Sequence, residues 1–157
     1  MIATSDRSST VTANQTLNAP PHQIFPLLCP VREYDWIDDW SCAIISSRTG
    51  IAELNCVFTT KRDYGHSKPK DEIWIVSRYE PPRVIEFVKF CADLYVIKYD
   101  IWLNSLAENL TQAVWTQTRI PLSADGEAAL EATTQEAFQT MAGDLESRLN
   151  DYLETDQ

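Results

Sequence analysis

The sequence is poor in the residues that common phosphate and metal sites need. Its 157 residues include four glycines and two histidines. So few glycines argue against a Gly-rich phosphate loop, and His22 and His66 stand in no H-x-E or HExxH spacing. Because no G-x-S-x-G elbow is present either, the sequence predicts no catalytic residue, no metal site and no cofactor.

Paired cysteines and long apolar runs are also missing. The four cysteines, at positions 29, 42, 56 and 91, form no CxxC pair. Residues 1–9 are polar and lack the basic start and apolar core of a signal peptide, and no apolar run approaches the roughly 20 residues that cross a bilayer. We therefore expect reduced, mostly buried cysteines, a cytoplasmic location and no membrane insertion.

Positive charge is scarce. The chain has 13 basic and 23 acidic residues, a net charge of −10, and an isoelectric point near 4.5. Binding to nucleic acid or anionic lipid requires Lys and Arg to neutralise phosphates, which such a surface does not offer. We expect no nucleic-acid partner.

What the chain does contain is a series of short alternating segments rich in β-branched and aromatic residues. After a disordered tail at residues 1–9, residues 10–157 are expected to form one domain, which begins with a strand at Thr10–Leu17. Short turn-rich separators favour antiparallel neighbours. The further strands are predicted at Cys42–Arg48, Ile51–Lys61, Glu72–Tyr79, Val84–Cys91, Leu94–Leu103 and Gln112–Pro121.

Helices are predicted in three places. A short helix begins at Pro21, and a second would place Trp36 and Trp40 on one face at i, i+4 spacing. A single long helix is predicted over Asp125–Leu153, capped by Ser123 or Asp125 and roughly 40 Å long. Its inward stripe is Phe138, Met141, Leu145, Leu149 and Tyr152. Small residues near its start leave space there, which indicates a cavity beside the early turns.

Several segments resemble the Bet v 1-like or START-like (SRPBCC) superfamily. They are residues 18–21 before the first helix, the Trp-bearing segment after it, residues 78–82 closing a strand, and residues 115–119 before the long helix. Residues 29–36 are similar to an uncharacterised bacterial branch. The resemblance implies an α+β helix-grip fold, in which a curved antiparallel seven-stranded sheet wraps around the C-terminal helix. It also implies a cavity for apolar ligands such as lipids or polyketides, without a universal catalytic set.

Aromatic side chains are the best candidate ligand contacts, although each could instead pack the core or lie on the outer face of the sheet. Met141 on the long helix and Arg119, which could meet a ligand carboxylate, complete the set. The candidates are Trp36, Trp40, Phe58, Trp74, Phe87, Tyr95, Tyr99, Trp115, Arg119, Phe138 and Met141. Among strand charges, Lys98 and Asp100 are predicted to face outward, whereas alternation leaves Glu72 and Arg119 undecided.

Three functions remain open. The first is binding of a small hydrophobic or amphipathic ligand, lipid-like or polyketide-like. The second is a polyketide cyclase or dehydratase-type enzyme, which requires two titratable side chains facing each other inside the cavity. The third is a protein-interaction module, which requires an exposed apolar patch. A homodimer is a further option.

Overall fold

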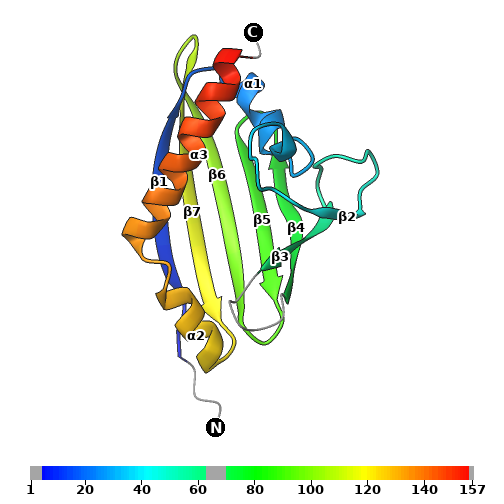
Figure 1. Cartoon of the computed structure of the whole chain (residues 1–157), viewed down its shortest axis with the longest axis vertical. Helices are drawn as coiled ribbons and strands as arrows, with labels where there is room; N and C mark the ends of the chain where they lie inside the picture. Colours follow the sequence, from blue (N-terminus) through cyan, green and yellow to red (C-terminus); the bar gives the residue numbers. More distant parts are fainter. Residues whose placement is uncertain (1–4, 63–69, 156–157) are drawn as a thin grey trace.

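The computed structural model describes residues 5–62 and 70–155, and its core is one antiparallel sheet of seven strands in the order β1-β7-β6-β5-β4-β3-β2. This arrangement, with a long C-terminal helix beside a curved sheet, confirms the predicted α+β helix-grip class (Figure 1). The strands are β1 (Ser9–Leu17), β2 (Ala43–Ser46), β3 (Val57–Arg62), β4 (Lys70–Glu80), β5 (Val84–Cys91), β6 (Tyr95–Ala107) and β7 (Leu110–Pro121).

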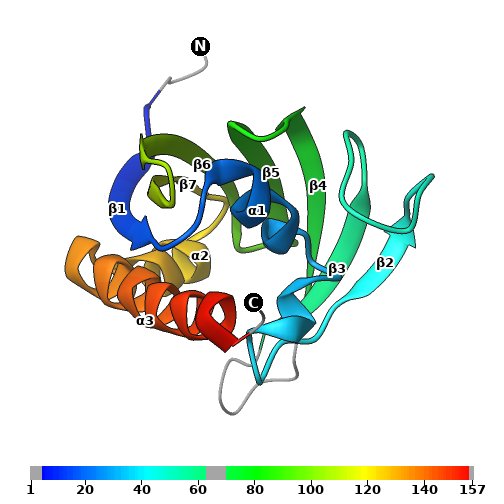
Figure 2. The same ribbon diagram turned by 90° about the horizontal axis from the view of Figure 1, so that it is seen from above.

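The sheet curls so that its inner face surrounds the core, as Figure 2 shows from above. Alternation along the strands selects which side chains face inward. In β5, Ile85, Phe87 and Lys89 are buried and face inward, whereas Phe90 is exposed on the outer face. Helix α3 (Gln135–Thr155) runs along the β1 side of this arc and closes it.

Helix α3 is held to the free edge of β1 by polar side chains. Gln135, Gln139 and Glu146 accept hydrogen bonds from the backbone N–H groups of Thr12, Asn14 and Thr16, at 2.9, 3.0 and 2.6 Å. The amides of Gln135 and Gln139 also donate to the carbonyls of Thr12 and Asn14. Because an unpaired strand edge must otherwise be satisfied by water or by another chain, this ladder both protects β1 and fixes the height of α3.

The single helix predicted over Asp125–Leu153 is wrong. The structure has α2 (Ala124–Glu131) and α3, separated by residues 132–134. Thr134 caps α3 by accepting from the N–H of Ala137 at 3.0 Å, and Arg119 donates to the carbonyls of Leu130, at 3.1 Å, and Thr133. These bonds satisfy the carbonyl of Leu130 in the last turn of α2 and that of Thr133 in the connection, so the helix can end without a proline or glycine.

Ser123 is the residue that caps α2, because its hydroxyl accepts from the N–H of Gly126 at 3.0 Å. Gly126 lies so close to the backbone of Leu94 that a Cβ atom would approach its carbonyl oxygen to 1.6 Å. The absence of a side chain there lets α2 pack directly on the turn before β6.

The segment before β2 also differs from the prediction. The first helix is α1 (Pro21–Ile24) continued by a 3-10 helix (Phe25–Leu28), but the second is a single 3-10 turn at Glu33–Asp35 that ends before Trp36. The indoles of Trp36 and Trp40 therefore do not share a helix face, and each donates a hydrogen bond to a backbone carbonyl. Trp36 donates to the carbonyl of Leu27 at 2.9 Å, and Trp40 to that of Pro30 at 2.7 Å.

Most strand boundaries agree with the prediction within a few residues, but the strand expected over Ile51–Lys61 begins only at Val57. Asn55 has a φ of 69°, in the left-handed region, which interrupts extended backbone. Most of the polar stretch 63–70 between two predicted strands, which includes His66, lies outside the described residues, as do the first four residues of the expected tail. No disulfide joins the four cysteines, all of which lie within the described residues. Within the described ranges, no helix has the length and apolar character needed to cross a membrane.

Candidate functional site

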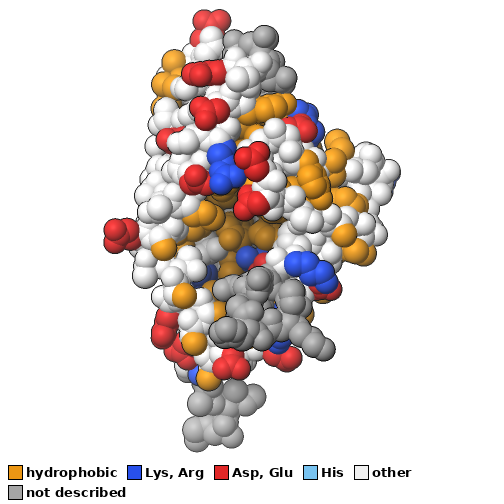
Figure 3. Space-filling model, viewed as in Figure 1, with side chains coloured by type: hydrophobic (Ala, Val, Ile, Leu, Met, Phe, Trp, Pro, Cys, Tyr) orange, Lys and Arg blue, Asp and Glu red, His pale blue; other side chains and the backbone are white. Residues whose placement is uncertain are grey.

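A cavity of about 330 Å³ lies between the inner face of the sheet and α3. Figure 3 shows it as a hollow with a hydrophobic floor, between α3 and the segment that follows α1. Its lining is mostly aromatic and aliphatic: Leu28, Pro30, Glu33, Ile37, Asp39, Trp40, Phe58, Trp74, Phe87, Lys89, Tyr99, Ile101, Trp115, Met141 and Leu145.

The aromatic wall is built on four adjacent strands. Trp74 of β4 stacks on Phe58 of β3 and on Tyr99 of β6, with ring centroids 5.4 Å apart in both pairs. Phe87 of β5 meets Trp74 edge-on, with centroids 6.0 Å apart. Such offset and edge-to-face pairs are favourable beyond the area that they bury. The wall is therefore a rigid apolar surface suited to a flat ring.

Trp115 of β7 is positioned by a chain of hydrogen bonds that ends on α3. Its indole N–H donates to Gln15 of β1 at 2.8 Å, and the Gln15 amide donates to the carbonyl of Ala142 at 2.8 Å. A buried tryptophan thus has its polar atom satisfied, while its ring is left to line the cavity.

An ion pair stands inside, on the inner face of the sheet. The Lys89 ammonium lies 3.0 Å from the Glu72 carboxylate, and both side chains are almost completely buried. Glu72 also accepts a hydrogen bond of 2.6 Å from the Tyr95 hydroxyl. The ammonium lies over the rings of Trp74, at 4.8 Å, and Tyr99, at 5.5 Å. Lys89 is therefore held by both charge and cation–π attraction.

A second cavity, of about 260 Å³, adjoins the first. Lys89, Tyr99 and Met141 line both of them. The two cavities therefore form one site, and a separate hollow of about 470 Å³ lies beside α1. The second cavity lies beside the joint between α2 and α3, where the small residues of the predicted helix indicated a cavity. Its remaining lining residues are Glu72, Ile97, Gln117, Leu130, Thr133, Ala137 and Phe138.

Gln117 lines the second cavity, and its side-chain amide is only partly paired. Its amide N–H donates to the Tyr99 hydroxyl oxygen at 2.6 Å. Its carbonyl oxygen is buried and accepts no hydrogen bond from any residue that the structure describes. Because Tyr99 acts as acceptor in this bond, its own hydroxyl hydrogen can be donated to another group.

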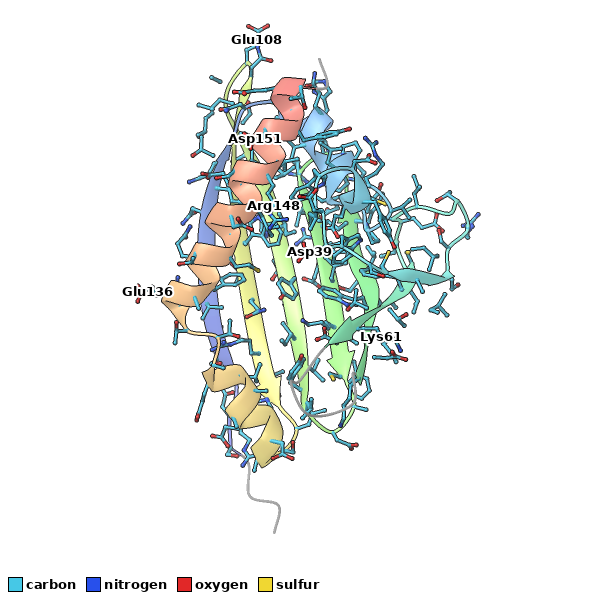
Figure 4. All side chains as sticks on the ribbon, viewed as in Figure 1. Asp39, Lys61, Glu108, Glu136, Arg148 and Asp151 are labelled. Atoms are coloured by element: carbon cyan, nitrogen blue, oxygen red, sulfur yellow. The ribbon has the colours of Figure 1, made fainter. Side chains whose placement is uncertain are left out.

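Two acidic residues lie toward the other end of the first cavity. Desolvation raises the pKa of the Glu33 carboxyl to about 8, so this side chain is mainly a neutral acid at pH 7. Asp39 lies at the opening, where it pairs with Arg148 of α3 at 3.5 Å. Figure 4 shows these two residues approaching each other from opposite sides of the opening. Arg148 also pairs with Asp144, at 2.9 Å.

Most of the predicted contact residues come together at the cavity. Trp40, Phe58, Trp74, Phe87, Tyr99, Trp115 and Met141 line the first cavity, and Phe138 and Met141 line the second. Met141 is 38% exposed, so it borders the cavity instead of packing in the core. Tyr95 is buried behind Glu72.

Trp36 and Arg119 lie elsewhere. Trp36 is buried against the first helix, and Arg119 holds the end of α2 through its guanidinium. Burial lowers the pKa of Arg119 from its ordinary value. Neither residue lines either of the two cavities.

Sequence reasoning missed Lys89 and Glu33 altogether. The inward orientation of Lys89 could have been predicted from alternation along β5, because Lys89 lies two residues from both Phe87 and Cys91, which face inward. Glu33 carries no such signal, because its orientation depends on where the turn Glu33–Asp35 packs.

The outer face of the sheet carries exposed apolar side chains. Ile73, Phe90 and Ile120 are each at least 40% exposed, and the strand register places them in one row with Val96 between. The interaction module and the homodimer remain predictions.

Comparison with known proteins identifies the fold. No model of a protein family matches the sequence, and no curated protein matches it. The solved structure of the Zhui aromatase/cyclase from Streptomyces sp. R1128 superposes with a TM-score of 0.70 at 15% identity, covering 96% of this chain and 96% of that chain. An uncharacterized protein from Rhizobium leguminosarum gives 0.65 at 11% identity, covering 94% of this chain and 95% of the other.

The structure of Ara h 8.0201 gives a TM-score of 0.59 at 14% identity, covering 89% of this chain and 99% of that chain. At such low identity the likeness establishes the fold alone. It confirms the Bet v 1-like or START-like helix-grip fold that the sequence motifs predicted.

Proposed function

We propose that this protein binds a small hydrophobic or amphipathic molecule in the cavity between the sheet and α3. The observation that carries the proposal is the aromatic wall with a few polar groups set into it. Small-molecule sites typically combine an apolar lining with a small number of placed polar groups, in volumes from about 300 Å³ upward. The first cavity alone has a volume of about 330 Å³.

Native mass spectrometry of gently purified protein is the first test. A discrete excess mass that disappears on denaturation would identify a bound molecule, and extraction would give its chemical class. Titration with the neutral fluorophore N-phenyl-1-naphthylamine is the second, and we expect saturable binding of one probe per chain.

A cavity-filling variant tests whether the probe binds where we propose. Met141→Trp places a large ring at the border of both cavities, so we expect probe affinity to fall at least about tenfold, as when a well-buried contact is lost. Ser147→Trp, on an exposed position of the same helix, is the matched control and should bind normally. No saturable binding, or equal binding by both variants, would contradict the proposal.

A second candidate, a cyclase or dehydratase-type enzyme, is favoured by one specific observation. Glu72 and Lys89 are two titratable side chains that face each other on the inner face of the sheet, and such a pair is what a cyclase or dehydratase-type enzyme requires. The Glu72 carboxylate could accept a proton from a carbon next to a carbonyl, while the Lys89 ammonium donates a hydrogen bond to the carbonyl oxygen. Incubation with a synthetic β-triketone, followed by mass spectrometry for loss of water, tests it. A rate equal to that of Glu72→Gln would contradict the enzyme for this substrate class.

A further inference from the structure

We infer that the ligand is an uncharged ring-containing molecule with a carbonyl-type oxygen, which accepts a hydrogen bond from the Lys89 ammonium, and that the site rejects the carboxylate of the same skeleton. This inference rests on the proposed binding function and specifies its ligand class. It comes from the charges and donors on the walls of the two adjoining cavities.

The position of Lys89 makes it the polar centre of the site. It lies on β5 opposite Trp74 of β4 and Ile97 of β6, and its side chain borders both cavities. A molecule that enters the first cavity and extends into the second lies beside Lys89, Tyr99 and Met141, the residues that line both cavities. Any oxygen that it carries near its middle can therefore meet a strong donor.

The charge on Lys89 is already compensated. Glu72 neutralises it at 3.0 Å. The Arg119 guanidinium, which is buried on β7, donates its hydrogen bonds to the carbonyls of Leu130 and Thr133 and to the Ser9 hydroxyl. At the mouth, Arg148 is shared between Asp39 and Asp144. A ligand carboxylate would thus lose its hydration without gaining a net counter-charge, and would stand beside the Glu72 carboxylate. A neutral oxygen has neither disadvantage.

Two side chains where the cavities meet, Lys89 and Tyr99, can donate hydrogen bonds to a ligand. An ammonium group has three N–H donors, and one faces Glu72 while the others lie among the aromatic rings. The Tyr99 hydroxyl, which already accepts from Gln117, can also donate. A carbonyl oxygen has two lone pairs and can accept from both groups. A hydrocarbon would leave these donors unpaired.

The aromatic wall selects the body of the ligand. Trp74 stands between Phe58 and Tyr99 in near-parallel stacks, with interplanar angles of 12° and 28°. A flat ring can continue this stacking and keep its oxygen near the ammonium, because the ammonium itself lies 4.8 Å from the Trp74 ring centroid.

Three isosteric probes test the inference by displacement of N-phenyl-1-naphthylamine at pH 7. They are 2-acetylnaphthalene, 2-isopropylnaphthalene and 2-naphthoate, which share a ring system and differ at one substituent. We expect the ketone to bind about tenfold more tightly than the hydrocarbon, as one charge-assisted hydrogen bond would give. The carboxylate should bind at least about tenfold more weakly than the ketone.

Charge variants then separate the two parts of the inference. Lys89→Met should abolish the preference for ketone over hydrocarbon. Glu72→Gln leaves Lys89 uncompensated, so naphthoate should gain at least about tenfold in affinity relative to the unsubstituted protein. The double variant Glu72→Gln/Lys89→Met removes both charges and guards against misfolding of the single variants. Lys98→Met, on the exposed outer face, is the matched control and should retain the full preference.

The outcomes distinguish this inference from the binding function on which it rests. If the fluorophore itself does not bind, and the three probes therefore have nothing to displace, the binding function fails. If the fluorophore binds but the hydrocarbon equals the ketone, or naphthoate binds most tightly to the unsubstituted protein, the ligand class is overturned and the binding function stands.

Discussion

The sheet carries a carboxylate–lysine group on each face, in very different surroundings, on β4 and β5 inside and on β5 and β6 outside. On the inner face Glu72 and Lys89 lie 3.0 Å apart, with side chains 8% and 10% exposed. On the outer face Lys98 approaches Glu86 at 3.8 Å and Asp100 at 4.0 Å, and is 47% exposed. Both groups arise from alternation along β4, β5 and β6, which places neighbouring residues on opposite faces.

The comparison shows that coverage of one sheet face by α3, and not residue type, determines how far a carboxylate–lysine pair is removed from solvent. The outer carboxylates share a proton site. Burial and the hydrogen bond with Glu86 raise the pKa of Asp100 to about 6. Burial opposes ionisation of Glu86 as well, but its hydrogen bonds together with the charges of Lys98 and Arg78 outweigh that effect and lower its pKa. Solvent beside them screens the lysine. The inner pair is removed from water, so each member depends on the other.

The largest expected effect comes from breaking the inner pair. Lys89→Met should lower the free energy of unfolding by about 3–5 kcal/mol, because it leaves the Glu72 carboxylate buried without a counter-charge. Lys98→Met should change it by less than about 1 kcal/mol. Urea denaturation of both variants measures the difference.

The double variant Glu72→Gln/Lys89→Met is the control for this prediction. It removes both charges, so it should recover much of the stability that the single substitution loses. Equal destabilisation by Lys89→Met and Lys98→Met would show that the inner pair is as well solvated as the outer one.

A pH titration sharpens the comparison through Glu33. Its pKa of about 8 in the folded protein exceeds the ordinary value of 4.5, so the folded state holds this proton more tightly than the unfolded chain does. The stability that this proton provides is complete below about pH 4.5 and is lost as the pH rises to about 8, at about 1.4 kcal/mol per pH unit within that window.

Glu33→Gln should therefore remove a downward slope of stability between pH 6.5 and 8, and should be more stable than the unsubstituted protein at pH 8. Asp100, with its pKa of about 6, is already largely ionised in that interval, which makes Asp100→Asn the matched control. Denaturant midpoints measured across this pH interval test the prediction. If stability falls with pH equally in Glu33→Gln and in the unsubstituted protein, Glu33 is already ionised in the folded state.

The smallest effect is expected at the rim of the cavity. Arg148→Ala breaks the pairs with Asp39 and Asp144, but Asp39 is largely exposed to solvent. Pairs of this kind contribute about 0–1 kcal/mol, so the unfolding free energy should change by no more than that. Thermal denaturation at low and high salt measures it. A decrease of more than about 2 kcal/mol in the unfolding free energy would show that the Arg148 pairs contribute as much as a buried ion pair does.

Local pattern was a good guide wherever burial follows alternation. Val84–Cys91 was predicted with the bounds that β5 has, and most aromatic candidates, such as Trp74 and Trp115, do border the cavity. Period-two alternation needs no knowledge of distant residues, because the pleat alone sends successive side chains to opposite faces.

Long-range contacts account for the failures. The break between α2 and α3 depends on Arg119, which reaches the carbonyl of Leu130 from a neighbouring strand. The ladder between α3 and β1 joins Gln135 to Thr12 across most of the chain. Neither contact leaves a local signature, since both Gln and Arg are ordinary residues on exposed helices and strands.

The sequence by itself determined most of the strands and the helical character of the C-terminal segment, because these follow from periodicity and turn residues that act over a few positions. The helix-grip class was predicted from the resemblance to a known superfamily. Only the tertiary structure decided that Lys89 meets Glu72 and that the Glu33 carboxyl is desolvated. Charge and burial at a site depend on what covers it, and the cover comes from residues far along the chain.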